Sequence, residues 1–233
     1  MQKPFAKYLL LLALALGAPA SLAQGLAPDA LLRTAAFDVI DDIQQDPGLQ
    51  RADSGRVAAL VEAKILPLFD FAHMTRLAAA RNWHLATTEQ QRMLTEEFKS
   101  MLVRTYSTAL ARYRGEQIVF KQTRAAPSAD EVTVRSEVIQ PGKERMTLDY
   151  DMRKTGAGWK IYNVKVADVS LISTYREVFA EKVRAGGVDG LIKFLADENR
   201  GSASRFNSIA NSFWEKSKVM YAIFQNVFRT ALQ

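Results

Sequence analysis

The chain has 233 residues, no cysteine, 31 lysines and arginines against 25 aspartates and glutamates, and a formal net charge of +6. The lack of cysteine excludes disulfides and thiolate metal sites, and the basic excess falls short of the clustered basic stripe that nucleic-acid binding requires. A chain of this length can bury a hydrophobic core without covalent crosslinks.

The amino terminus has the three parts of an export signal. Two lysines precede the apolar run 8–18, and Ser21 and Ala23 are the small residues that a signal peptidase accepts. The run is too short to span a hydrocarbon core of about 30 Å. We therefore predict a signal peptide at residues 1–23, with cleavage after Ala23 and export of the mature chain.

Helical spacing dominates the first part of the mature chain. Apolar residues recur every three or four positions in residues 31–43, and Pro47 ends this predicted helix. Asp53 or Ser54 is expected to cap a second helix, whose apolar face runs from Val57 to Ile65.

The longest predicted helix runs from Thr88 to about Arg114. Thr87 and Gln90 lie three positions apart just before and inside its first turn, which is the spacing of a capping box. Apolar side chains then recur at helical spacing along the whole segment.

The apolar period then changes from 3.6 to 2, which predicts four strands near residues 118–120, 132–138, 146–152 and 159–161. The connections carry turn residues and are too short for parallel crossovers, so an antiparallel meander is expected. In the last strand apolar residues occupy both alternations, which is consistent with a sheet covered on both faces. The many valines fit either an open cavity against the sheet or simple strand propensity.

Helical spacing returns after Ser170, Gly186-Gly187 interrupts it, and a last short helix is predicted at residues 188–195. Helices, then a sheet, then helices predict an α+β domain over residues 24–200, with a twisted antiparallel four-stranded sheet packed against helices.

Recognisable catalytic and cofactor motifs are absent. His73 and His84 are the only histidines and do not have metal-ligand spacing. The sequence contains no Gly-x-Ser-x-Gly elbow, phosphate loop or dinucleotide fingerprint. We therefore expect no catalysis, no metal and no cofactor, with an enzyme of unfamiliar type as the weaker alternative.

Four separated blocks resemble, in order, the MlaC family of periplasmic phospholipid-binding proteins, also called the toluene-tolerance auxiliary component. The blocks contain Asp70-Phe71-Ala72-His73-Met74-Thr75-Arg76-Leu77 with Arg81-Asn82-Trp83, Leu102-Val103-Arg104-Thr105-Tyr106, Leu148-Asp149-Tyr150 with Trp159-Lys160-Ile161-Tyr162, and Val169-Ser170-Leu171 with Tyr175-Arg176. The chain departs from the family pattern at Ala80 and Asp168, where glycine is usual, and at Asn163, where aspartate is usual.

The resemblance implies a nuclear-transport-factor-like sheet that encloses an apolar pocket for the acyl chains of a glycerophospholipid. It also implies a periplasmic ferry between an outer-membrane lipoprotein complex and an inner-membrane ABC transporter, which maintains the lipid asymmetry of the outer membrane. The open alternative is a periplasmic binding protein for another apolar molecule, such as a hopanoid or an organic solvent.

Candidate lipid-binding residues come from the predicted sheet and the helices expected to face it. The three tyrosines are the better candidates because a buried phenol needs a polar partner, which a lipid ester could supply. Plain core packing is the alternative for each residue. The candidates are Tyr106, Val134, Val138, Met146, Leu148, Tyr150, Val164, Val166 and Tyr175.

The C-terminal segment, residues 201–233, lies beyond the resemblance and reads as an amphipathic helical extension. Its apolar residues recur at helical spacing, and four basic residues face a single acid, Glu215. This balance is typical of a helix on a membrane surface. The same stripe would also suit packing onto the domain or onto a second copy.

Overall fold

The computed structural model describes residues 26–110, 116–123, 126, 128–139, 142 and 144–200. The predicted signal peptide at residues 1–23 and the C-terminal segment 201–233 lie outside these ranges. Within the described ranges, no helix combines the length and apolar character needed to cross a membrane.

The helices fall into two groups along the chain. The first comprises α1 (Pro28–Gln45), α2 (Pro47–Gln50) and α3 (Ser54–Leu60), followed by a π-helical turn at Val61–Ile65 and a 3-10 turn at Leu66–Leu68. The second comprises α4 (Phe71–Ala79), a 3-10 turn at Ala80–Leu85, α5 (Thr88–Leu110) and, after the sheet, α6 (Leu171–Arg200).

The sheet is antiparallel and has five strands in the order β1-β2-β3-β4-β5, where four were predicted. The strands are β1 (Gln117–Phe120), β2 (Glu131–Ile139), β3 (Met146–Thr155), β4 (Gly158–Val166) and β5 (Val169–Ser170). The predicted meander is thus correct, but the sequence pattern missed β5. A strand of two residues is too short to show alternation, and α6 begins immediately after it.

A β-bulge explains why β4 carries apolar residues on both alternations. Asp151 pairs with Asn163, but the next residue, Met152, pairs with Ile161, so Tyr162 is an extra residue on β4. The bulge shifts the phase of the strand and brings Ile161 onto the same face as Val164. On β2, the residues that point to the other face, Glu131, Thr133 and Arg135, are exposed, so that face is not covered along this strand.

Helix boundaries follow the predicted signals. The Thr87 amide donates to the Gln90 side chain at 2.9 Å and the Gln90 amide to the Thr87 hydroxyl at 3.2 Å, which completes the capping box of α5. The Asp53 carboxylate caps α3. Gly187, with φ of 67°, breaks α6 at the predicted position. The predicted end of α5 near Arg114 lies outside the described residues.

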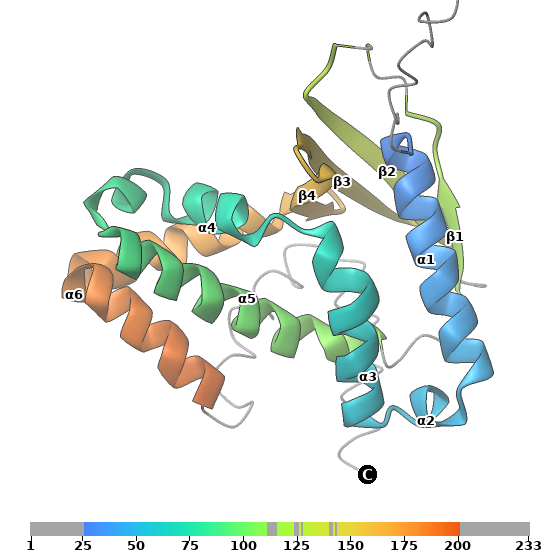
Figure 1. Ribbon diagram of the computed structural model, residues 1–233, viewed down its shortest axis with the longest axis horizontal. Helices are drawn as coiled ribbons and strands as arrows, with labels where there is room; N and C mark the ends of the chain where they lie inside the picture. Colours follow the sequence, from blue (N-terminus) through green and yellow to red (C-terminus); the bar gives the residue numbers. More distant parts are fainter. Residues whose placement is uncertain are drawn as a thin grey trace, which may run out of the picture.

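The helices lie in two groups, with α4, α5 and α6 on one side of the molecule and α1 to α3 on the other (Figure 1). Helices α4, α5 and α6 contact one another and form the main core with β3 and β4. Helices α1 to α3 have a small core of their own. Leu32 of α1 also packs on Val134, Met152 and Ile161 of the sheet. The apolar face of the sheet therefore lies between two helical groups with separate cores.

Candidate functional site

Seven of the nine candidate residues lie on one face of the sheet. Tyr150 of β3 pairs with Val134 on β2 and with Val164 on β4. Directly paired residues project to the same face of a sheet. The remaining members follow the same alternation, with Leu148 paired to Val166 and Val138 to Met146.

The other two candidates, Tyr106 and Tyr175, come from α5 and α6 and approach each other from the helical side. The ring of Tyr175 packs edge-on against Phe98, with 5.0 Å between ring centroids. Burial raises the pKa of both phenols, and each hydroxyl lies near enough to the other to affect its pKa. Both tyrosines are therefore neutral hydroxyls in an apolar setting.

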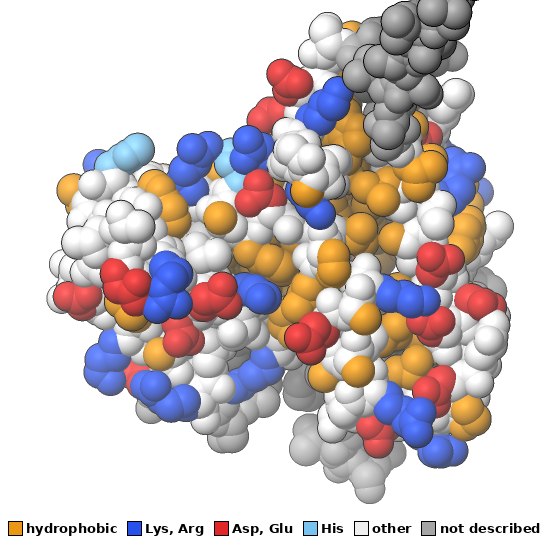
Figure 2. Space-filling view, viewed as in Figure 1, with side chains coloured by type: hydrophobic (Ala, Val, Ile, Leu, Met, Phe, Trp, Pro, Cys, Tyr) orange, Lys and Arg blue, Asp and Glu red, His pale blue; other side chains and the backbone are white. Residues whose placement is uncertain are grey.

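Burial divides the nine candidates into two sets. Four belong to the closed core, namely Val134, Met146, Val166 and Tyr175. Five remain partly accessible, namely Tyr106, Val138, Leu148, Tyr150 and Val164. Figure 2 shows apolar side chains gathered between the group of helices α4 to α6 and the group of helices α1 to α3. We call the apolar face of the sheet, together with Tyr106 and Tyr175, the apolar wall, and the five accessible residues are its partly exposed portion.

Aromatic neighbours extend this wall beyond the predicted residues. Phe120 of β1 stacks on Tyr150 with 6.4 Å between centroids, and Phe69 stacks on Phe71 with 5.6 Å. The alternation of β1 could have identified Phe120. Phe69 follows the turn at Pro67, where the apolar residues have no regular period, so no sequence pattern predicts its position.

The apolar wall also contains buried hydroxyl groups. Ser136 is fully buried, and within the described part of the chain its Oγ makes no hydrogen bond of good geometry. The same holds for the buried hydroxyl of Tyr175. Burial raises the pKa of Tyr150, and the neighbouring Ser136 hydroxyl partly opposes this rise. Sequence reasoning missed Ser136, although its place between Val134 and Val138 puts it on their face.

The opposite face of the sheet carries a polar network. Arg135 donates to both carboxylate oxygens of the buried Asp149, at 2.7 and 2.6 Å. Asp151 accepts hydrogen bonds from Thr133 at 2.7 Å, Asn163 at 2.9 Å and Lys165 at 3.0 Å. Burial would raise the pKa of Asp151, but these hydrogen bonds together lower it. The network is satisfied internally and stabilises the sheet.

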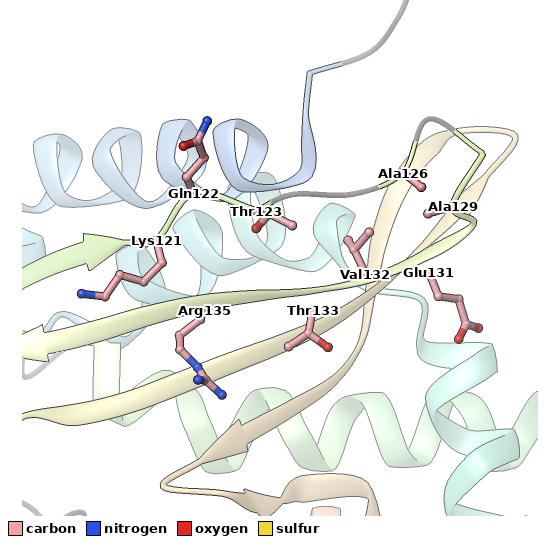
Figure 3. A pocket seen from close by; sticks show the side chains of 9 residues that line it. All are labelled: Lys121, Gln122, Thr123, Ala126, Ala129, Glu131, Val132, Thr133 and Arg135. Carbon is pink, nitrogen blue, oxygen red and sulfur yellow. The ribbon is translucent and has the colours of Figure 1, made fainter.

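A shallow pocket of about 320 Å³ opens on this polar side, between β2 and the segment that follows β1 (Figure 3). Its basic residues are already engaged: Lys121 pairs with Glu137 at 2.9 Å and Arg135 with Asp149 at 2.6 Å. None of the nine candidates lines this pocket, and among its described lining residues both basic side chains are paired.

Asp70 and His73, in the first of the four blocks that resemble the MlaC family, have structural roles. Asp70 caps α4 by accepting from the His73 amide at 2.9 Å, and its other oxygen pairs with Arg153 at 3.1 Å. Burial, followed by the charges of Arg153 and Arg76, lowers the pKa of His73. In the described part of the chain, no group of three His, Asp or Glu residues could hold a metal ion.

Two departures from the family pattern coincide with left-handed backbone. Ala80, at the end of α4, has φ of 50° and ψ of −128°, and Asp168 has φ of 66°. Glycine adopts positive φ at little cost, whereas a Cβ makes it strained. At both positions the backbone therefore has the positive φ that favours glycine, although the residues are alanine and aspartate.

The chain matches known proteins in sequence. The family model described as MlaC protein matches residues 33–197. The chain is 28% identical over 109 residues to the toluene tolerance protein ttg2D of Pseudomonas putida, covering 45% of this chain and 48% of that one. It thus spans about half the length of this curated relative.

A solved structure extends the comparison. It is a phospholipid-binding protein from Ralstonia solanacearum in complex with a phospholipid, 39% identical, with a TM-score of 0.69, covering 75% of this chain and 98% of that one. The resemblance drawn from the four sequence blocks is confirmed.

Proposed function

Because the chain belongs to the MlaC family, we propose that it is a periplasmic carrier that binds one glycerophospholipid with its acyl chains against the apolar face of the sheet. The observation that carries the proposal is the one-sided wall of partly accessible apolar residues, with Leu148, Tyr150 and Val164 at its centre. The similar Ralstonia protein, solved with a phospholipid, supports the same ligand class.

The energetics of lipid transfer explain why such a wall is needed. A two-chain lipid in water exposes on the order of 30 methylene groups at about 0.8 kcal/mol each, or roughly 24 kcal/mol. A protein that buries the chains to the same extent as the bilayer removes this cost on both sides of the transfer. The carrier then needs no catalytic group, and the direction of net lipid transport must be set by its partners.

The route of the lipid is part of the proposal. The carrier receives or delivers lipid at an outer-membrane lipoprotein complex and at an inner-membrane ABC transporter, and so maintains outer-membrane asymmetry. Residues 1–23 direct export and are removed. Residues 24–200, with their nuclear-transport-factor-like sheet and pocket, form the carrier domain. Residues 201–233 supply a contact with the membrane surface.

Native mass spectrometry of the protein purified from its periplasm tests the ligand directly. We expect a bound mass at one lipid per chain, and organic extraction should identify a glycerophospholipid. An extracted hopanoid or another apolar molecule would replace the phospholipid with the alternative ligand. A ligand-free mass, with no uptake from phospholipid vesicles, would contradict the carrier function. Hydrolysis products that accumulate from labelled phospholipid would instead indicate an enzyme.

A further inference from the structure

Resting on the carrier function, we propose that the hydroxyls of Ser136 and Tyr175 bind the ester oxygens of the lipid and make the site selective for diacyl lipids. The two groups come from different elements, β2 and α6, and both face the apolar wall. Each is buried without a well-formed hydrogen bond in the described part of the chain. A bound ligand can therefore supply a hydrogen-bond acceptor to both hydroxyls.

Ser136 lies in the middle of the wall. Its cross-strand neighbours are Phe120 on β1 and Leu148 on β3, and Val138 follows it on the same face. Leu148 and Val138 are partly accessible, so a lipid lying on them passes directly over Ser136. A small displacement of these side chains brings its Oγ into contact with the ligand.

Tyr175 faces the same space from the helices. It belongs to the core cluster that Leu148 and Tyr106 pack against. The Tyr106 hydroxyl lies near that of Tyr175, and burial keeps both protonated, as the raised pKa values show. Tyr175 is therefore a hydrogen-bond donor at any physiological pH.

The chemistry of these groups points to an ester. A hydroxyl buried without a partner costs free energy, which a ligand acceptor recovers on binding. The carbonyl oxygen of an acyl ester is a good acceptor, and a diacyl glycerolipid carries two of them. An ether-linked lipid has the same shape but much weaker acceptors, and a hydrocarbon ring system such as a hopanoid core has none. Hydrogen bonds to ester carbonyls would therefore distinguish diacyl glycerolipids from apolar molecules without esters, such as hopanoids. An apolar wall alone would bind both classes.

Competition between matched lipids tests the proposal. Delipidated protein is offered an equimolar mixture of dioleoyl phosphatidylethanolamine and its dioleyl ether analogue, and native mass spectrometry gives the ratio of the bound species. We expect the wild type to prefer the diester by about three- to tenfold, the range of one or two net hydrogen bonds. Ser136→Ala and Tyr175→Phe should each lower the ratio, and the double variant should bring it near one.

Tyr162→Phe is the matched control. It removes the same phenolic oxygen, but the Tyr162 hydroxyl reaches Glu131 at 3.3 Å, away from the wall, so the ratio should stay at the wild-type value. A ratio of one in the wild type, or an unchanged ratio in the double variant, would overturn the inference while leaving the carrier function intact. If neither lipid binds to the wild type, the carrier function itself fails.

Stability without ligand provides a second readout. Because neither hydroxyl makes a hydrogen bond of good geometry in the described part of the chain, Ser136→Ala and Tyr175→Phe should leave the midpoint of thermal unfolding of the ligand-free protein unchanged or higher. A lowered midpoint in both variants would assign the hydroxyls to the core and overturn the role in ligand selection. The expected combination is weaker diester preference with undiminished stability.

Discussion

The Asn163 side-chain amide donates to a carboxylate oxygen of Asp151 at 2.9 Å, and the Asn163 carbonyl oxygen accepts from Ser170 and from the amide of Ile172. One side chain thus joins the polar network of the sheet to the start of α6. An aspartate at this position would keep both acceptor contacts and place a second carboxylate beside Asp151.

Asn163→Asp should therefore destabilise the protein at pH 7 by about 1–3 kcal/mol, because two buried carboxylates cannot both stay charged at low cost. The loss should shrink towards about pH 5, where one of the two carboxyls binds a proton. Urea unfolding at both pH values measures it. Asn163→Ala, which removes the donor without adding charge, should show no such recovery, and equal losses at both pH values in Asn163→Asp would contradict the explanation.

Ala80→Gly should stabilise the protein by about 1 kcal/mol, because glycine relieves the strain of a positive φ. The neighbouring Ala79 has an ordinary helical conformation, with φ of −69° and ψ of −23°. Ala79→Gly should therefore destabilise by a similar amount or more. Chemical denaturation of both variants gives the comparison, and effects of the same sign would show that the backbone at Ala80 is not strained.

His73 should titrate below its ordinary pKa of 6.5, because burial and two nearby arginines disfavour the imidazolium more than Asp70 and Glu131 favour it. The folded state then prefers neutral His73, so this stabilising contribution is present above pH 6.5 and is lost as the pH falls through the folded pKa. NMR titration of the imidazole measures the shift. A pKa at or above the ordinary value would contradict the structural cause.

His73→Phe checks the consequence for stability. The phenyl ring can keep the edge-on contact with Tyr162, where the ring centroids lie 5.1 Å apart, but it cannot bind a proton. Between pH 6.5 and about pH 5, the variant should lose less stability than the wild type. Parallel curves over this range would mean that His73 does not contribute to the acid sensitivity.

Leu148→Glu should reduce co-purified lipid at least about tenfold, because a carboxylate on the apolar wall must be desolvated against the acyl chains. Thr147→Glu places the same charge one residue earlier, on the opposite face of β3, and should retain the lipid. Native mass spectrometry counts the lipid, and circular dichroism verifies that both variants fold. Equal lipid content in the two variants would remove the apolar face of the sheet from the binding site.

Truncation after Arg200 should leave the described domain folded and weaken its association with anionic phospholipid vesicles. The end of α6 is held independently of the segment 201–233, since Asn199 donates to the backbone and carboxylate oxygens of Glu97 at 3.0 and 2.6 Å. Vesicle co-sedimentation at low salt measures the association. If association is unchanged and thermal stability falls, the segment packs on the domain or on a second copy instead.

The sequence predicted the parts of the fold that depend on period and local signals. The alternation of β2 and β3 placed Val134 and Tyr150 on the correct face, and the capping box at Thr87 located the start of α5. These features could be read because each is determined by residues close together in the chain.

The features that sequence reasoning missed depend on contacts between distant residues. The bulge at Tyr162 follows from how β3 and β4 pair, and it reversed the expected pattern of faces on β4. The polar network unites Thr133, Asp151 and Asn163, which lie on three different strands. The division of the candidates into core and accessible wall depends on how α5 and α6 pack, which no period specifies.

The shortness of the two outer strands has a consequence for behaviour at high protein concentration. β1 has four residues and β5 has two, so each outer strand presents few backbone amides and carbonyls in line for pairing with another chain. A protein with an accessible apolar face is at risk of adding strands edge to edge and forming fibrils. Short outer strands lower this risk, so that the sheet can retain an accessible apolar face.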